Sequence, residues 1–433
     1  MPRYHGLDFL RAAMMLMGVL LHVGCMYMPI PNGANVEAIL GDFKNPYRDV
    51  DGLSQTIQRV VFLIHYFRMP AFMLLAGFFA ALVDQKRGSG SLLKNRLQRI
   101  VLPAVLFWFL LWPIDSLAWS FGERMMTDTD QSQSTLGHLI DSISLSHLPF
   151  LGDSTLHTMH LWFLYYLIMY YGVTFVGLGL IRKITPSVPA KVVQWRDRTL
   201  SSRGKYLILP SLMLASWATL RASPSWHFLA AFRFTPELHC FVNHYVFFLV
   251  GWFFYGADSV IPHLRKHAWT YLAFGFAMSC VLTWSAEGFF DLFMAGPLSE
   301  VETHQMGVFL GISQVIQAAC VWLLIFALVG LSERYITKAS PLCTYLVGAS
   351  YWLYLIHRPL CTGFSICFDR FEIPSLMKAS IVSFLVTAIC LLTYHYLVSN
   401  SWIAVLLNGR RASDQRNTAP VQHDAGEGLP AAT

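Results

Sequence analysis

Long apolar stretches separated by shorter polar segments run through the whole chain. Ten of them hold roughly 20 mainly apolar residues each, the length that a helix needs to cross a bilayer. They are residues 7–28, 60–83, 100–121, 160–182, 206–222, 238–257, 268–286, 306–331, 343–365 and 376–398. Since a backbone inside a membrane must satisfy its hydrogen bonds internally, each stretch predicts a helix. We therefore expect an all-α polytopic membrane protein with about ten transmembrane helices.

The composition agrees with a membrane protein. Hydrophobic residues make up 55% of the 433 residues and charged residues only 13%, about half of the charged share that is typical of soluble domains. A soluble multi-domain enzyme, a disordered chain and a secreted disulfide scaffold therefore fit poorly. The eight cysteines lie in or at the ends of apolar stretches and form no CxxC pair. We interpret them as buried apolar residues and predict no metal site.

The distribution of basic residues predicts the orientation. Most of the 31 Lys and Arg residues lie near the two termini and in alternate connecting segments. Because basic loops favour the cytoplasm, both termini are expected there, with an even number of spans. The basic residues form short scattered clusters, which argues against a nucleic-acid partner. We predict one transmembrane domain over residues 1–400 and a disordered cytoplasmic tail over 401–433.

Ionisable residues inside the apolar stretches carry the functional information, because a charge at mid-membrane costs at least ~2.5 kcal/mol. In the first stretch, Asp8 and Arg11 are three residues apart and are expected to pair on the helix surface. His22 lies eleven residues, or about three helical turns, beyond Arg11 and so returns to the same face. This places His22 in the outer half of the membrane.

Three other stretches place histidine or arginine near the same depth. The second has His65 and Arg68, the fourth opens at His160, and the ninth has His357 and Arg358. The aromatic residues that accompany them are Trp162 and Tyr354. A single membrane histidine is often a packing residue that hydrogen-bonds a carbonyl group, but a set on four helices favours a common polar site. We predict that this site faces the external side.

The residue types fit two kinds of chemistry. A neutral histidine in a water-poor pocket is a suitable general base for a hydroxyl group. Buried arginines suit a carboxylate, a phosphate or a developing oxyanion. Acyl transfer to an alcohol uses both types of residue, and so does proton-coupled transport. The residue types by themselves leave both open.

Four motifs resemble those of the acyltransferase 3 family of polytopic bacterial membrane enzymes. They are LDFLR with His22 eleven residues after Arg11, FRMPAFMLLAGFF at 67–79, HLWFL at 160–164 and SYWLYLIHRPL at 350–360. The resemblance runs from about residue 4 to 400. Within the family, the motifs are similar to the subgroup called glucans biosynthesis protein C.

This resemblance implies an enzyme of the bacterial inner membrane that needs no bound cofactor. It implies transfer of an acyl group from a cytoplasmic acyl-CoA to sugar hydroxyls outside, and in this subgroup the transfer of succinyl to periplasmic glucans. The partners are then the glucan, the acyl-CoA and membrane lipid. By motif position, His22 corresponds to the catalytic histidine, Arg11 to its paired arginine and Arg68 to the arginine of the second span.

The resulting mechanism is a hypothesis about named residues. Arg11, oriented by Asp8, would hold the donor's phosphates with the basic segment 85–99. His22 would deprotonate the acceptor, and Arg68 would stabilise the oxyanion or the succinyl carboxylate, helped by His65 or by the His357–Arg358 pair. The substrate-binding set comprises Asp8, His160, Trp162, Tyr354, His357 and Arg358.

Three alternatives remain open at this stage. The sequence also fits a transporter or exporter of a polysaccharide unit, an O-acyltransferase for another cell-surface carbohydrate, or a non-catalytic component of a glucan assembly complex. A transporter would move intact substrate without consuming acyl-CoA.

Overall fold

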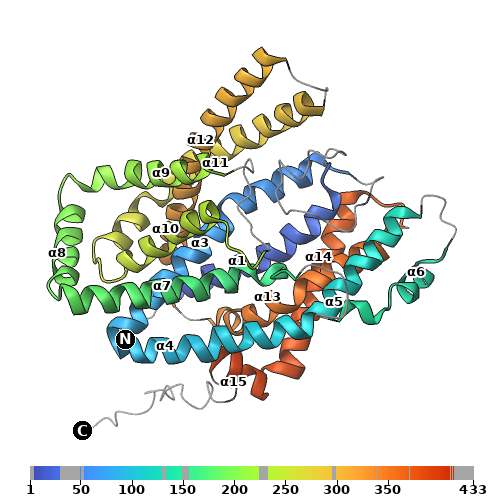
Figure 1. Ribbon diagram of the computed structural model, residues 1–433, viewed down its shortest axis with the longest axis horizontal. Coiled ribbons are helices and arrows are strands. Elements are labelled where there is room, and N and C mark those ends of the chain that lie inside the picture. The colour runs from blue at the N-terminus through green and yellow to red at the C-terminus, as the bar shows by residue number, and fades with distance from the viewer. Residues whose placement is uncertain are drawn as a thin grey trace, which may run out of the picture.

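The computed structural model is helical throughout the part of the chain that it describes (Figure 1). The described residues are 4–29, 49, 53–128, 133–148, 156–223, 233–294, 299–338, 340–369, 371–409, 411 and 413. Within these ranges the β-structure consists of an isolated bridge between His157 and Arg233. The all-α fold class is thus confirmed.

The helical elements range from single turns to a helix that is 36 residues long. In chain order they are α1 (His5–Gly24), η1 (Cys25–Tyr27), α3 (Gln55–Arg87), α4 (Ser89–Arg96), η2 (Leu97–Val101), α5 (Leu102–Thr127), α6 (Thr135–Asp141), η3 (Leu145–His147), η4 (Met159–Leu161), α7 (Trp162–Ile184), α8 (Val188–Ser201), α9 (Lys205–Arg221), α10 (Leu238–Phe254), α11 (Val260–Met294), α12 (Glu300–Tyr335), α13 (Pro341–Cys367), α14 (Ser375–Thr393), η5 (Tyr394–Val398) and α15 (Trp402–Asn408). Two short elements, η2 and η5, are π-helical turns.

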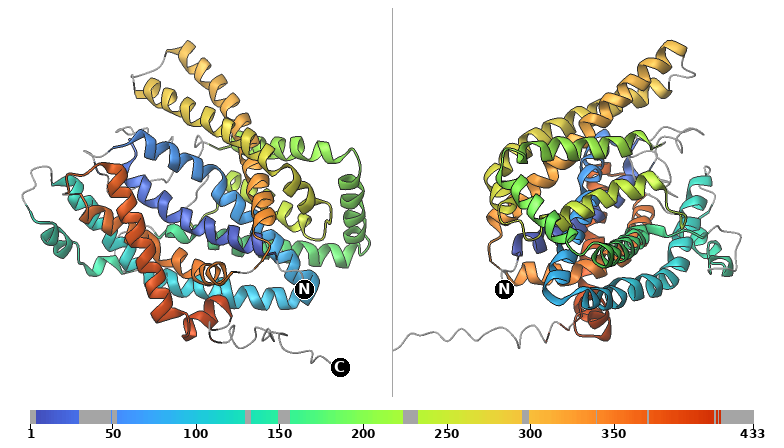
Figure 2. Two further views of the ribbon diagram at one scale, coloured as in Figure 1. Left: turned by 180° about the vertical axis from the view of Figure 1, so that it is seen from behind. Right: turned by 60° about the vertical axis from the view of Figure 1, so that its left-hand side comes forward.

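Each predicted span coincides with a helix, and six helical stretches in the described residues are long and apolar enough to cross a membrane. A shorter apolar helix is α10. The predicted spans 268–286 and 306–331 are longer in the structure, because α11 and α12 continue through polar residues at their ends. These two helices pack along each other, and their far ends project beyond the other helices (Figures 1 and 2). A capping box between Ser299 and Glu302 starts α12.

Two segments that we expected outside regular structure are helical. The basic segment 85–99, expected as a connecting loop, completes α3, forms α4 and enters the π-helical turn η2. Gly88, with φ of +79°, makes the only break between α3 and α4. Residues Trp402–Asn408, which we assigned to the tail, form α15, and Ala404 is buried there. Tail residues 414–433 lie outside the described residues.

The helices divide into a central and a peripheral set. The apolar windows of α3 and α12 are 72% buried, whereas those of α7 and α14 are only 28% buried. The peripheral helices therefore present most of their apolar surface outward, as helices in contact with lipid do. Helix α1 packs between α13 and α3 and also contacts α12 and α14, so it lies among the central helices.

Two glycines let α3 and α10 approach closely. A β-carbon at Gly77 would strike the carbonyl group of Phe248, and a β-carbon at Gly251 would strike the carbonyl group of Leu74. Small residues at such crossings are typical of membrane helix pairs, because association there depends on van der Waals packing. This crossing fixes the depth at which α3 carries its arginine.

We expect Gly77→Ala to destabilise the protein by about 1–3 kcal/mol, because the added methyl group overpacks the α3–α10 crossing. Gly172→Ala is the matched control, since Gly172 is exposed on α7 and a β-carbon there meets open space. The thermal unfolding midpoint of the detergent-solubilised variants measures the difference. Equal midpoints for the two variants would contradict the close crossing.

Candidate functional site

Three of the four predicted histidines come together from separate parts of the chain. The ring of His22 on α1 lies 5.1 Å from that of His357 on α13, centroid to centroid. The His357 ring lies 5.5 Å from that of His160 in η4, just before α7. We call His22, His160 and His357 the histidine cluster.

Hydrogen bonds fix which ring nitrogen acts as the donor in two members of the histidine cluster, His160 and His357. His357 Nδ1 donates to the carbonyl oxygens of Leu353 and Tyr354, at 3.0 and 2.8 Å, and His160 Nε2 donates to that of Leu355 at 3.0 Å. The opposite nitrogens, His357 Nε2 and His160 Nδ1, are buried and have no hydrogen-bond partner among the described residues. In the neutral rings these atoms carry lone pairs, so the cluster holds unused proton acceptors.

Arg68 on α3 brings a positive charge to the cluster. A β-carbon added at Gly18, one turn before His22, would lie 3.2 Å from Arg68 Nη1. The charge interacts with both His22 and His357. Arg68 is only 6% exposed, and its Nε and Nη1 atoms lack hydrogen-bond partners among the described residues. A buried cation with unused donors is costly unless an anionic group binds it.

Arg358 is occupied by a carboxylate that sequence analysis did not single out. Its Nη1 atom lies 3.0 Å from each carboxylate oxygen of Asp115 on α5, and both side chains are largely buried. Arg358 was predicted to bind substrate, and in the structure it holds α13 to α5. Asp115 is the only ionisable residue in the predicted span 100–121. Asp115 could have been predicted as a functional or pairing residue, because an ionisable residue inside a membrane helix needs a partner.

Two other predicted residues lie away from the histidine cluster. His65 lines a separate cavity of about 30 Å³ together with Asn243 and His244. The ring of Trp162 lies 5.6 Å from that of His244, on the same side. His65 therefore faces a second cavity between α3, α9, α10 and α12, and Trp162 contacts His244, which also lines that cavity.

The predicted pair at the start of α1 is confirmed. Arg11 Nη2 lies 3.5 Å from Asp8 Oδ1. Arg11 also lies over the ring of Phe79, with the guanidinium carbon 5.4 Å from the ring centroid. Asp8 and Phe79 thus hold Arg11 on the face of α1 that continues to His22.

A cavity of about 260 Å³ occupies the space between Arg11 and the histidine cluster. Each of three helices lines it with one stripe of residues spaced three or four apart. The stripes are Arg11 and Met15 on α1, Phe79, Ala76, Leu75 and Phe72 on α3, and Val347, Ser350, Tyr351 and Tyr354 on α13. Continued by one or two turns, these stripes reach His22, Arg68 and His357 respectively. The cavity and the cluster thus follow one another along the same faces of these three helices, and we call the two together the passage.

Tyr354 stands at the junction of the two parts. It lines the cavity, and its hydroxyl donates to the carbonyl oxygen of His160 at 2.7 Å. Its ring lies 5.7 Å from that of His160 and 6.2 Å from that of His357. The predicted substrate-binding role of Tyr354 fits this position, since a molecule that reaches the histidine cluster from the cavity passes its ring.

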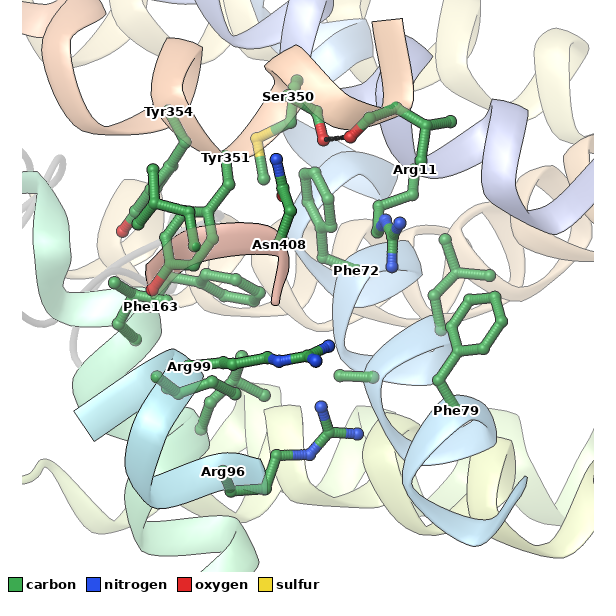
Figure 3. A pocket seen from close by; sticks show the side chains of 18 of the residues that line it. Arg11, Phe72, Phe79, Arg96, Arg99, Phe163, Ser350, Tyr351, Tyr354 and Asn408 are labelled. Carbon is green, nitrogen blue, oxygen red and sulfur yellow. Dashed lines mark hydrogen bonds between the residues drawn. The ribbon is translucent and has the colours of Figure 1, made fainter. Parts of the chain in front are cut away.

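The opposite end of the cavity is strongly basic. Arg96 at the end of α4 and Arg99 in the π-helical turn line it together with Arg11, and their guanidinium groups face a common space (Figure 3). Arg96 lies over the ring of Tyr171, 4.8 Å from its centroid. None of the described residues that line the cavity is acidic. The arrangement suits a ligand with several negative charges at one end.

Sequence analysis did not single out three residues at this basic end. Arg96 and Arg99 entered it only as part of the basic segment 85–99, and Asn408 lay in the predicted tail. A π-helical turn often marks a functional site, but its presence is not readable from sequence. The passage thus combines a basic mouth (Arg11, Arg96 and Arg99), an apolar middle and the histidine cluster beside Arg68, two of whose donor atoms have no hydrogen-bond partner among the described residues.

Comparison with known proteins gives one match. A family model described as an acyltransferase domain matches residues 4–395. No curated protein and no solved structure matches the chain. The matched region contains the histidine cluster, Arg68 and the basic residues of α1, α4 and η2, and it ends before α15.

We expect Asp115→Asn to lower stability by about 3–5 kcal/mol, because it leaves Arg358 as a buried unpaired charge. The double variant Asp115→Leu/Arg358→Met is expected to recover most of the loss, since it removes both charges. Thermal unfolding in detergent measures both effects. Glu287→Gln serves as the control, because Glu287 pairs with the exposed Arg59 and its loss should change little. A stable single variant would mean that Arg358 does not depend on Asp115.

Proposed function

The chain belongs to the acyltransferase 3 family, and from this premise we propose that it is an O-acyltransferase of the bacterial inner membrane. The proposed donor is succinyl-CoA, and the proposed acceptors are hydroxyl groups of periplasmic glucans. The observation that carries the proposal is the passage from the basic mouth to the histidine cluster. It offers a charged binding site for a nucleotide at one end and a general base at the other.

The proposed orientation follows from the basic residues. We place both termini in the cytoplasm and let all ten predicted spans cross the membrane. The basic mouth, formed by Arg11, Arg96 and Arg99, then opens toward the cytoplasm, where acyl-CoA is available. The histidine cluster then lies in the outer half of the membrane, near the periplasm.

The donor would lie along the passage. Its phosphates would bind the arginines of the mouth by charge-assisted hydrogen bonds, and its flexible arm would lie in the apolar middle of the cavity. The thioester would then pass Tyr354 to reach the histidine cluster. Binding the phosphates at the mouth would keep the charged part of the donor out of the membrane interior.

His22 is the proposed general base. The acceptor oxygen attacks the thioester carbonyl carbon while His22 removes the hydroxyl proton. The carbon–sulfur bond then breaks, and the departing sulfur takes the proton from His22. Arg68 and His357 adjoin His22 and are the proposed partners for the developing negative charge.

The unpaired charge of Arg68 supports an acyl group that is itself anionic. A succinyl group carries a carboxylate, which would satisfy the unused Nε and Nη1 donors of Arg68. The periplasmic glucan acceptor rests on the resemblance of the motifs around Arg68, His160 and His357 to the glucan-modifying subgroup. Mass spectrometry of surface glucans from wild-type and deletion strains tests both groups, since the mass shift identifies what is transferred.

We predict that His22→Gln lowers glucan acylation by about 10²–10⁴-fold, because the general base is lost. The variant is expressed in a deletion strain at normal membrane abundance, and the acyl content of the glucans is measured. His395→Gln is the matched control, since His395 is exposed in η5 away from the passage. Retained acylation in His22→Gln would remove this residue from the mechanism.

We predict that Arg68→Gln lowers kcat/KM for succinyl-CoA about 10- to 100-fold more than kcat/KM for acetyl-CoA. The reason is that a hydrogen bond to a charged group is worth about 1.5–3 kcal/mol, and only succinyl offers a carboxylate. Purified protein in lipid nanodiscs with a soluble glucan acceptor gives both constants. An equal loss for the two donors would instead assign Arg68 to the oxyanion.

A further inference from the structure

The C-terminal helix α15 closes one side of the basic mouth. It packs against the π-helical turn η2, and Leu407 and Asn408 at its end line the cavity. Asn408 Nδ2 donates to the carbonyl oxygen of Gly348 on α13 at 2.9 Å. The helix is thus fixed both to the element that carries Arg99 and to the wall of the passage. It lies beyond the region that the acyltransferase family model matches.

Gly409 ends α15 in a conformation that favours glycine. Its φ of +78° and ψ of 4° are left-handed, and its N–H donates to the carbonyl oxygen of Val405 at 2.9 Å. This is the usual way to end a helix with a glycine. A side chain at this position would also collide with a neighbouring residue.

The guanidinium group of Arg99 occupies the space beside Gly409. A β-carbon at this residue would collide with Nη2, Cζ and Nε of Arg99. The guanidinium therefore rests directly against the glycine backbone. Each of the three arginines of the mouth has such a neighbour, since Arg11 lies over Phe79 and Arg96 lies over Tyr171.

These contacts restrict the arginine side chains before a ligand arrives. An arginine loses rotamer entropy when it binds an anion, and a side chain that is already held loses less. Two of the three arginines are held by aromatic rings, and Arg99 is held against the backbone of the C-terminal helix. Replacing Gly409 would displace the Arg99 guanidinium even though residue 409 carries no chemical group of its own.

We propose that α15 is part of the donor site and that Gly409 is a positioning residue, whose bare backbone holds Arg99 toward the phosphates of the donor. This inference rests on the proposed function, because it takes the donor to be a coenzyme A thioester. It assigns to the C-terminal segment a specific role in donor affinity and none in the chemical step.

The test compares Gly409 with Gly256. Both glycines have the same positive φ, and each lies near an arginine of its own, Arg99 and Arg196 respectively. Gly256 has φ of +78°, and a β-carbon there would lie at an ordinary contact distance of 3.8 Å from Arg196 Nη1. Gly256→Ala therefore introduces strain from positive φ without displacing an arginine. Full-length wild-type protein, Gly409→Ala and Gly256→Ala are purified in nanodiscs. Calorimetry measures coenzyme A binding, and initial rates give KM and kcat for succinyl-CoA.

We expect Gly409→Ala to weaken coenzyme A binding at least tenfold and to raise the donor KM with little change in kcat. Gly256→Ala should bind coenzyme A within twofold of the wild type. In an Arg99→Gln background, Gly409→Ala should add less than a twofold effect, because the displaced group is already gone. Pantetheine, which lacks the nucleotide, should not distinguish Gly409→Ala from the wild type.

The outcomes separate this inference from the proposed function. Normal coenzyme A affinity in Gly409→Ala, or the same loss in the Arg99→Gln background, would overturn the role of Gly409 alone. A wild-type protein that does not bind coenzyme A would overturn the proposed donor as well. If Gly409→Ala does not fold, Asn408→Ala replaces it, since it releases α15 from Gly348 without adding a β-carbon. An unchanged donor KM in that variant would also overturn the inference.

Discussion

The cost of an unpaired charge in a membrane interior is the constraint on which the site depends. Arg68 is buried next to His22 and His357, and two of its donor atoms have no protein partner among the described residues. Asp115 neutralises Arg358 nearby, whereas Arg68 forms no ion pair with the described residues. This leaves a positive charge beside the histidine cluster. In the proposed reaction, Arg68 binds negative charge and His22 accepts a proton.

Close helix packing keeps the charge in place. The glycine crossing of α3 and α10 fixes the depth of Arg68, and Gly18 on α1 leaves room for its guanidinium. The Asp115–Arg358 pair ties α13 to α5 and so locates the adjacent His357. Because α1 packs directly against both α3 and α13, the polar residues of the three helices are brought together by helix packing.

The passage separates binding from chemistry along its length. Donor phosphates are proposed to bind where Arg11, Arg96 and Arg99 meet, about three helical turns from His22 along α1. A mainly apolar stretch of the cavity, lined by Met15, Phe72 and Leu75, lies between the two regions. The C-terminal helix belongs to the first region alone, so donor affinity and acyl transfer can vary separately.

The sequence by itself determined the class of the fold, the positions of the long apolar helices and the pairing of Asp8 with Arg11. Length, hydropathy and helical periodicity are local properties, and they suffice for those conclusions. It also marked His22, His160, His357 and Arg68 as unusual, because ionisable residues in apolar stretches are costly wherever they lie. The tertiary structure alone decided which of the marked residues meet. His65 shares α3 with Arg68 but faces a different cavity, Arg358 faces Asp115, and α15 reaches the basic mouth, because the rotation of each helix about its axis is set by long-range packing that no local pattern contains.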